Sequence, residues 1–303
     1  MIGVPDRAPI VLFIYNRPEH TERTVASLAA NALAAESDLI VYADGSKKTE
    51  HDRAVNAARA VAHEARGFKS IRMIERDRNL GLANSIIAGV TEVCASYGRA
   101  IIVEDDLLLS PGFLDFMNTG LARFADEDHV YQVSGYMFPN VCEGRSSRFL
   151  PLTTTWGWGT WQRAWQHFDR NLSGLLTLEA NADLRRRFDL NGAYNYFEMA
   201  CRQKNGQVDS WGIAWYLTVF LRGGLVLYPS RSLVVNAGIE GSGTHGRGPS
   251  VLQGKISATN SNIEAAQMPN GLAIDHECLE LIETLLRSIR PTLFRRMKAW
   301  FTQ

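Results

Sequence analysis

Short apolar segments alternate with helical patterns through the first third of this chain. Apolar segments of strand length occur at residues 9–15, 39–42, 71–74 and 100–103. The segments between them have the spacing or composition of helices, at residues 18–33, 50–66 and 82–97. Parallel strands need a crossover connection, which is usually a helix, so this alternation predicts an α/β fold. We expect a mostly parallel central sheet with helices on both faces.

Polar residues follow three of these predicted strands where each one ends. They are Asn16-Arg17, Asp44-Gly45-Ser46 and Glu104-Asp105-Asp106. In open α/β sheets, ligands bind outside the carboxyl ends of the strands. This shared placement predicts one binding site at that edge of the sheet.

The acidic trio Glu104-Asp105-Asp106 is the strongest chemical signal in the sequence. Three adjacent carboxylates repel one another and are costly to desolvate, so packing alone rarely places them at a strand end. Oxygen ligands of this kind suit Mg²⁺ or Mn²⁺, and such a cation would neutralise a bound diphosphate. The alternative is an exposed acidic turn after a strand.

The periodicity weakens after residue 128. Strand-like segments occur at residues 131–135, 149–155, 225–228 and 233–235, and helical segments at 158–168, 178–188, 191–204 and 211–222. Residues 238–246 are rich in Gly and Ser, and the polar residues 248–275 are predicted to form a long surface loop. We therefore divide the chain into a first half (1–128), a smaller mixed second half (129–275) and a tail (276–303).

The tail has the pattern of a basic amphipathic helix. Its apolar residues recur at helical spacing and are interrupted by Pro291: Ile282, Leu285, Ile289, Leu293, Met297 and Trp300. Arginine and lysine residues supply the other face, which predicts binding to an anionic membrane surface. The alternative is a terminal helix packed on the domain.

Bulk composition excludes several classes of protein. Lys plus Arg and Asp plus Glu both number 32, so no global basic field is present to hold nucleic acid. The N-terminal residues lack the pattern of a secretory signal, and four cysteines are scattered without metal-like spacing. We expect reduced thiols and a cytoplasmic protein, with peripheral attachment to the inner face of the membrane if the tail binds there.

The order of the short motifs resembles that of a known group. Asn-Arg-Pro after the first strand is followed by Ala-Asp-Gly-Ser, then Asn79-Leu80-Gly81-Leu82-Ala83-Asn84, then Val-Glu-Asp-Asp. This set resembles GT-A-fold glycosyltransferases, which have a Rossmann-like fold. It is similar both to bacterial polysaccharide-type transferases and to the Golgi N-acetylglucosaminyltransferase that begins complex N-glycans. The resemblance is strong over residues 9–117 and looser over 153–245. It implies that residues 1–128 form a nucleotide-sugar-binding half and that residues 129–275 form an acceptor-binding half.

The resemblance implies roles for the residues of the donor site. Arg17 would meet the nucleotide or its phosphates, and Asp44 would accept a hydrogen bond from the uracil N3–H. Asp106 would be the direct ligand of Mn²⁺ or Mg²⁺. Gly45 and Ser46 would form the turn beneath the base. The ribose edge would be shaped by Asn79, Gly81 and Asn84. Glu104 and Asp105 would contact hydroxyls of the ribose or the donor sugar. An ordinary turn at 44–46 and a helix cap at Asn79 are the structural alternatives.

Three further residues are predicted to act near the transferred sugar. Asp209, before an aromatic helix start, is the candidate base for an acceptor hydroxyl, with a helix cap as the alternative. Trp158 belongs to Trp156-Gly157-Trp158-Gly159-Thr160-Trp161, which we interpret as a sugar-facing loop and, alternatively, as core tryptophans. His245 lies in the Gly/Ser-rich segment, where the resemblance implies a lid that offers a ligand to the metal or diphosphate, with an ordinary surface histidine as the alternative.

Together these features predict a metal-dependent, inverting glycosyltransferase that uses a nucleotide sugar, by expectation UDP-linked. The acceptor would be a hydroxyl of a bacterial glycan, a lipid-linked saccharide or a glycoconjugate. Two other functions are open: a non-catalytic nucleotide-sugar-binding scaffold subunit and a sugar nucleotidyltransferase. The second usually has a Gly-rich phosphate loop after the first strand, and residues 15–20 contain no glycine.

Overall fold

The computed structural model describes residues 7–142, 146–240, 252 and 268–289. Its main feature is an eight-stranded sheet of order β3-β2-β1-β4-β8-β6-β9-β7. A two-stranded sheet pairs β5 with β10. Among the described residues, no helix has the length and apolar character needed to cross a membrane.

The strands have these bounds: β1 Ile10–Ile14, β2 Asp38–Ala43, β3 Ser70–Glu75, β4 Arg99–Glu104, β5 Leu107–Leu109, β6 Val130–Ser134, β7 Arg148–Leu150, β8 Trp158–Trp161, β9 Leu225–Tyr228 and β10 Val234–Asn236. The α-helices are α1 Pro18–Ala29, α2 Asp52–His63, α3 Leu82–Tyr97, α4 Phe113–Arg123, α5 Gln162–Trp165, α6 Leu175–Ala180, α7 Ala182–Phe188, α8 Tyr196–Lys204, α9 Trp211–Leu221 and α11 His276–Ile289. Short 3-10 helices are η1 Ala34–Glu36, η2 Thr49–His51 and η3 Ala237–Glu240.

The first half of the fold follows the predicted alternation. Strands β3, β2, β1 and β4 are all parallel, with the helices α1, α2 and α3 as crossovers. Strands β1 and β4 are almost completely buried, because helices cover both faces of the sheet. The predicted α/β fold with a mostly parallel central sheet is therefore confirmed.

The second half extends the same sheet with mixed pairing. Strand β8 is antiparallel to both β4 and β6, β6 is parallel to β9, and β7 is antiparallel to β9. The predicted boundary at residue 128 falls between α4 and β6, and the sheet continues across it. The division into a donor half and an acceptor half stays a prediction.

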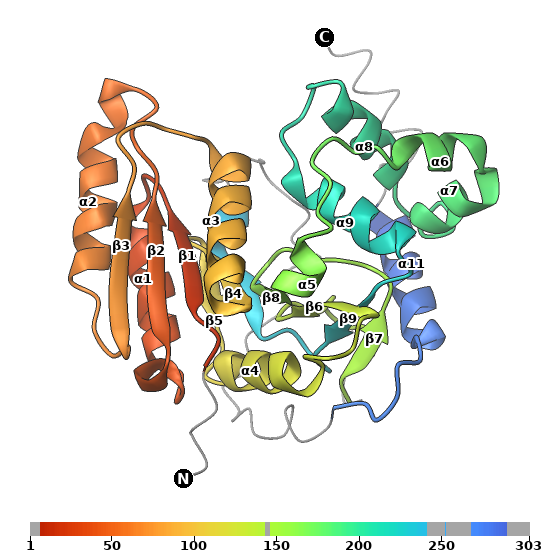
Figure 1. The fold of residues 1–303 in the computed structure, drawn as a ribbon, viewed down its shortest axis with the longest axis horizontal. Helices are drawn as coiled ribbons and strands as arrows, with labels where there is room; N and C mark the ends of the chain where they lie inside the picture. Colours follow the sequence, from red (N-terminus) through yellow and green to blue (C-terminus); the bar gives the residue numbers. More distant parts are fainter. Residues whose placement is uncertain (1–6, 143–145, 241–251, 253–267, 290–303) are drawn as a thin grey trace.

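Two hydrophobic cores lie on opposite faces of the sheet. One core contains α1, α2 and α4, and the other contains α3, α5, α8, α9 and α11. Figure 1 shows α3 in front of the first strands and α1 behind them. The predicted polar segments lie at the carboxyl ends of β1, β2 and β4, at one edge of the sheet.

Helix α11 is the described part of the predicted tail. Cys278, Ile282 and Leu286 are buried against the core, so this segment packs on the domain as the second interpretation expected. Residues 290–303, which carry most of the predicted membrane-binding character, lie outside the described residues.

The segment 158–168 differs from the helix that its pattern predicted. Residues 158–161 form strand β8 inside the sheet, and only Gln162–Trp165 are helical. Strand β8 pairs with both β4 and β6, so tertiary pairing sets its conformation. The segment 149–155 is likewise mostly irregular, with β7 ending at Leu150.

Candidate nucleotide-sugar site

The structure brings the three predicted polar segments to one edge of the sheet. Arg17 follows β1, Asp44 follows β2, and Glu104 is the last residue of β4. Because β2, β1 and β4 are adjacent and parallel, their carboxyl ends lie next to one another. The three predicted polar segments therefore lie together at one edge of the sheet.

The acidic trio begins at the last residue of β4 and continues into the turn before β5, and it contacts residues next to β1 and α1. The amide N of Tyr15 donates to Asp105 Oδ2 at 3.2 Å, and Arg17 Nη1 lies 3.3 Å from Asp106 Oδ2. The side chains of Arg17 and Asp106 are 20% and 18% exposed. The ion pair is therefore shielded from bulk water but still accessible at the surface of the site.

A second segment closes on Asp106 from the far end of the chain. The amide N of Ala237 donates to the carbonyl O of Asp106 at 2.7 Å. A Cβ placed on Gly238 would clash with Asp106 Oδ2, so a larger residue here would force this carboxylate to move. The pairing of β10 with β5 brings residues 237–238 to this position.

The environment of the trio favours the protonated carboxyls. Burial, and then the charges of the neighbouring carboxylates, raise the pKa of Glu104 to about 8 and that of Asp105 to about 7. Burial also raises the pKa of Asp106, while Arg17 and His20 act in the opposite direction. The cluster thus lacks enough positive charge to hold all three carboxylates ionised at low cost.

That deficit fits a divalent cation. Among the described residues, no three His, Cys, Asp or Glu side chains converge as a complete ligand set. Mg²⁺ is usually bound by one or two carboxylates together with substrate phosphates and water, so a complete protein cage is not required. Glu104, Asp105 and Asp106 are all partly buried, and the role of Asp106 as the ligand of Mg²⁺ or Mn²⁺ stays a prediction.

Asp44 holds the loop that follows β3. Its carboxylate accepts hydrogen bonds from the backbone amides of Gly45, Leu80 and Gly81, at 2.9–3.1 Å. These donors occupy most of the acceptor capacity of the carboxylate. The structure therefore shows a structural role for Asp44, and a contact to a base stays a prediction.

Gly45 lies directly against the same loop. A Cβ at this position would approach the backbone of Arg78 to 2.6 Å, so glycine is required by the close approach of the two chain segments. Asn79 Nδ2 donates to the carbonyl O of Gly45 at 2.9 Å. We call residues 44–46 and 76–81 the β2/β3 corner.

The other residues predicted for the ribose edge shape the start of α3. Gly81 precedes the helix with φ 78°, a conformation that glycine adopts without strain. Asn84 Nδ2 donates to the carbonyl O of Leu80 at 2.7 Å. Ser46 follows Gly45 at the edge of the corner. Roles for these residues toward a ribose stay predictions.

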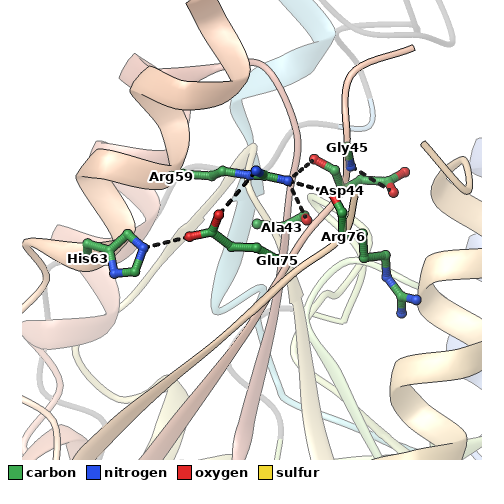
Figure 2. A network of polar contacts seen from close by, with 7 residues as sticks. All are labelled: Ala43, Asp44, Gly45, Arg59, His63, Glu75 and Arg76. Carbon is green, nitrogen blue, oxygen red and sulfur yellow. Dashed lines mark hydrogen bonds and ion pairs between the residues drawn. The ribbon is translucent and has the colours of Figure 1, made fainter. Parts of the chain in front are cut away.

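Two residues that the sequence analysis did not single out support the corner. Tyr15 Oη accepts from the amide N of Lys47 at 3.0 Å and is 2.6 Å from His51 Nδ1. Arg59 of α2 contacts the chain where it leaves β2 and β3, as Figure 2 shows. Arg59 is next to the buried Ala58 and lies at helical spacing from Val55 and Ala62. The sequence could have indicated it as a charged residue that borders the apolar face of a helix.

Asp209 lies just before α9, and Ser210 is the N-terminal residue that flanks the helix. Asp209 is exposed, and the described part of the chain offers its carboxylate no hydrogen bond or ion pair. A Cβ on Gly212 would contact Thr155, and Trp211 stacks on Trp158 with ring centroids 5.4 Å apart. Because Trp158 pairs with Ile102 of β4, the start of α9 lies near the end of β4 that carries the acidic trio.

The prediction that Trp158 faces a sugar is wrong. Trp158 is completely buried in β8 and packs among Trp165, Trp211 and Trp215. The glycines beside it serve packing, since a Cβ on Gly159 would lie 3.0 Å from Met117. Trp156 is only partly buried and contacts Tyr136 edge-to-face, so it is the indole of this segment that remains accessible. His245 lies outside the described residues.

Comparison with known sequences gives the family. Residues 10–168 match the sequence model described as glycosyl transferase family 2, which is slightly more than half of the chain. The chain belongs to glycosyl transferase family 2. The match includes β1 to β4, the acidic trio and β8, and it ends before Asp209. No curated protein matches the chain.

Several solved structures are similar at low identity. The mannosyltransferase PcManGT from Pyrobaculum calidifontis, in complex with GDP-Man and Mn²⁺, has 13% identity and a TM-score of 0.36, over 52% of this chain and 45% of that one. TarS from S. aureus has 12% identity and a TM-score of 0.41, over 75% and 36%. Mouse xyloside xylosyltransferase 1, in its apo form, has 11% identity and a TM-score of 0.36, over 70% and 81%.

These structural similarities are weak, so the family assignment rests on the sequence match. The aligned part of this chain spans less than half the length of the first two proteins. The particular resemblance to the Golgi N-acetylglucosaminyltransferase stays a prediction.

Proposed function

We propose that this family 2 chain transfers a sugar from a nucleotide sugar, by expectation a UDP-sugar, to an acceptor hydroxyl with inversion at the anomeric carbon. The observation that carries the proposal is the acidic trio at the end of β4, paired with Arg17 and adjacent to the β2/β3 corner. The acceptor would be a bacterial glycan, a lipid-linked saccharide or a glycoconjugate.

Each group has a role that follows from its position. The β2/β3 corner would bind the base and ribose, and Arg17 would pair with a phosphate as a planar cation with several donors. Asp106 would hold Mn²⁺ or Mg²⁺, which when bound stabilises the charge of the departing diphosphate. Glu104 and Asp105 would support that ligand and accept hydrogen bonds from sugar or ribose hydroxyls.

Asp209 would take the proton of the acceptor hydroxyl as its oxygen attacks the anomeric carbon. The bond from that carbon to the diphosphate oxygen breaks in the same step, so the configuration inverts. Its exposure and freedom from described protein partners suit a base that contacts an incoming acceptor. The partly buried Trp156 would offer an indole face to a sugar ring at the same edge.

The direct test is a panel of nucleotide sugars, assayed for hydrolysis or transfer with Mn²⁺, with Mg²⁺ and with a chelator. We expect turnover of at least one donor with a cation present, and loss of turnover in chelator and in Asp106→Ala. Full activity in chelator would contradict the metal role. Nucleotide binding by calorimetry without turnover of any donor would favour the non-catalytic scaffold instead.

A further inference from the structure

Arg59 links the ends of two strands behind the proposed nucleotide site. Its Nη2 donates to the carbonyl O of Arg76 at 2.7 Å, and lies 3.4 Å and 3.5 Å from the carbonyl O atoms of Asp44 and Ala43. Figure 2 shows the guanidinium reaching from α2 to the point where β2 and β3 end. One side chain therefore contacts both chain segments that make the β2/β3 corner.

The opposite side of the guanidinium is also fixed. Arg59 Nη1 lies 3.1 Å from Glu75 Oε2, and His63 Nε2 lies 2.6 Å from Glu75 Oε1. The Arg59 side chain is only 18% exposed. Because this arginine is mostly buried and is held by several hydrogen bonds and an ion pair, its side chain has little conformational freedom. It therefore fixes the positions of the segments that it contacts.

The contacts of Arg59 lie just behind the residues that would face the nucleotide. Asp44, whose carbonyl Arg59 contacts, holds the amides of Leu80 and Gly81 through its carboxylate. Arg76 begins the loop that presses the backbone of Arg78 against Gly45. A shift between the ends of β2 and β3 would therefore change the shape of the whole corner.

We propose that Arg59 is a positioning residue for nucleotide binding, acting through the β2/β3 corner on the base and ribose. This inference rests on the proposed function. It predicts an effect confined to the nucleoside end of the donor. In the described part of the chain, the acidic trio and Arg17 make no hydrogen bond or ion pair with Arg59, and they are held by residues next to β1 and β10. A general loss of fold would weaken both ends alike.

Lysine cannot replace this arginine. Its ammonium is a compact point charge, whereas the guanidinium fork reaches the carbonyls on one side and Glu75 on the other. Arg59→Lys therefore keeps the positive charge and loses the simultaneous contacts with the carbonyl O atoms and Glu75. Glu75→Gln has the opposite character, since it removes the ion pair and leaves the carbonyl contacts of Arg59 in place.

The experiment measures two probes, UDP and inorganic pyrophosphate, each with Mn²⁺, by calorimetry on the full chain. In Arg59→Lys we expect UDP to bind at least tenfold more weakly, with pyrophosphate affinity unchanged within twofold. In Glu75→Gln we expect UDP affinity within threefold of the original. Arg53→Ala is the matched control, because Arg53 is an exposed arginine of the same helix, and it should leave both probes unchanged.

Two results would overturn the inference. One is unchanged UDP affinity in Arg59→Lys. The other is equal weakening of UDP and pyrophosphate, which would show that Arg59 only maintains the fold. Failure of the proposed function is a separate result, because it would appear in the original protein as an absence of UDP binding with Mn²⁺.

Discussion

Arg17 Nη1 lies 3.3 Å from Asp106 Oδ2, so an ion pair joins the segment after β1 to the turn after β4. The pair lowers the pKa of Asp106 against the effect of burial, which raises it. One arginine does not balance three adjacent carboxylates, because the pKa values of Glu104 and Asp105 are still raised to about 8 and about 7. The cluster is therefore suited to accept a further positive charge.

This electrostatic state predicts a pH dependence for cation binding. Metal ligation needs ionised carboxylates, and the raised pKa values keep part of the cluster protonated near neutrality. We expect Mn²⁺ affinity to rise by roughly tenfold or more between pH 6 and pH 8.5, with proton release on binding. Calorimetry in two buffers of different ionisation enthalpy measures both effects. Constant affinity with no proton release across this range would contradict the prediction.

The same raised pKa predicts a stability effect of Glu104→Gln in the metal-free protein. A carboxyl with a folded pKa of about 8 binds a proton more tightly when folded, so the free energy of unfolding falls as pH rises from the unfolded pKa toward 8. We expect Glu104→Gln to stabilise the protein at pH 8.5 by on the order of 1–3 kcal/mol and to leave it nearly unchanged at pH 4.5. Urea unfolding at the two pH values tests this, and an equal effect at both would refute it.

Gly45→Ala is predicted to disrupt the β2/β3 corner. The new Cβ would lie 2.6 Å from the backbone of Arg78, which cannot yield as a flexible side chain would. We expect a loss of on the order of 1–3 kcal/mol of stability and at least tenfold weaker UDP binding. Gly271→Ala is the control, since a Cβ there has no neighbour within 4 Å. Equal melting temperature and UDP affinity in both variants would show that the contact is unimportant.

Asp209→Asn is predicted to affect the chemical step. The exposed carboxylate makes no hydrogen bond with the described residues, so replacing it with an amide should not change the stability of the protein measurably. Removal of a general base typically lowers the rate by roughly 10²–10⁴-fold. We expect that loss in kcat with donor KM changed by less than threefold, measured by steady-state transfer assays. A kcat within threefold of the original would remove Asp209 from the mechanism.

The sequence predicted the first half of the fold well because its parallel strands are buried on both faces. Continuous apolar runs such as Ile10–Ile14 and Ile101–Val103 are the direct result of that burial. The position of Arg17, Asp44 and the acidic trio at one edge followed from the same topology.

The second half was less accessible because non-local pairing determines it. The Trp-Gly alternation at 156–161 reads as a loop or a helix start, but it forms β8 because β4 and β6 pair with it from distant parts of the chain. The donors to the Asp44 carboxylate come from residues 80–81, and nothing near Asp44 in the sequence indicates them. Arg59 was missed for the same reason, since its carbonyl partners belong to two other elements.

The most direct test of the central claim is to measure Mn²⁺ binding in the presence of UDP. Electron paramagnetic resonance of the free cation reports how much Mn²⁺ is bound. The original protein should bind Mn²⁺, and UDP should increase that affinity. Asp106→Asn should retain its melting temperature and bind Mn²⁺ at least tenfold more weakly with UDP present. Undiminished Mn²⁺ binding by Asp106→Asn would contradict the assignment of the acidic trio as the cation site.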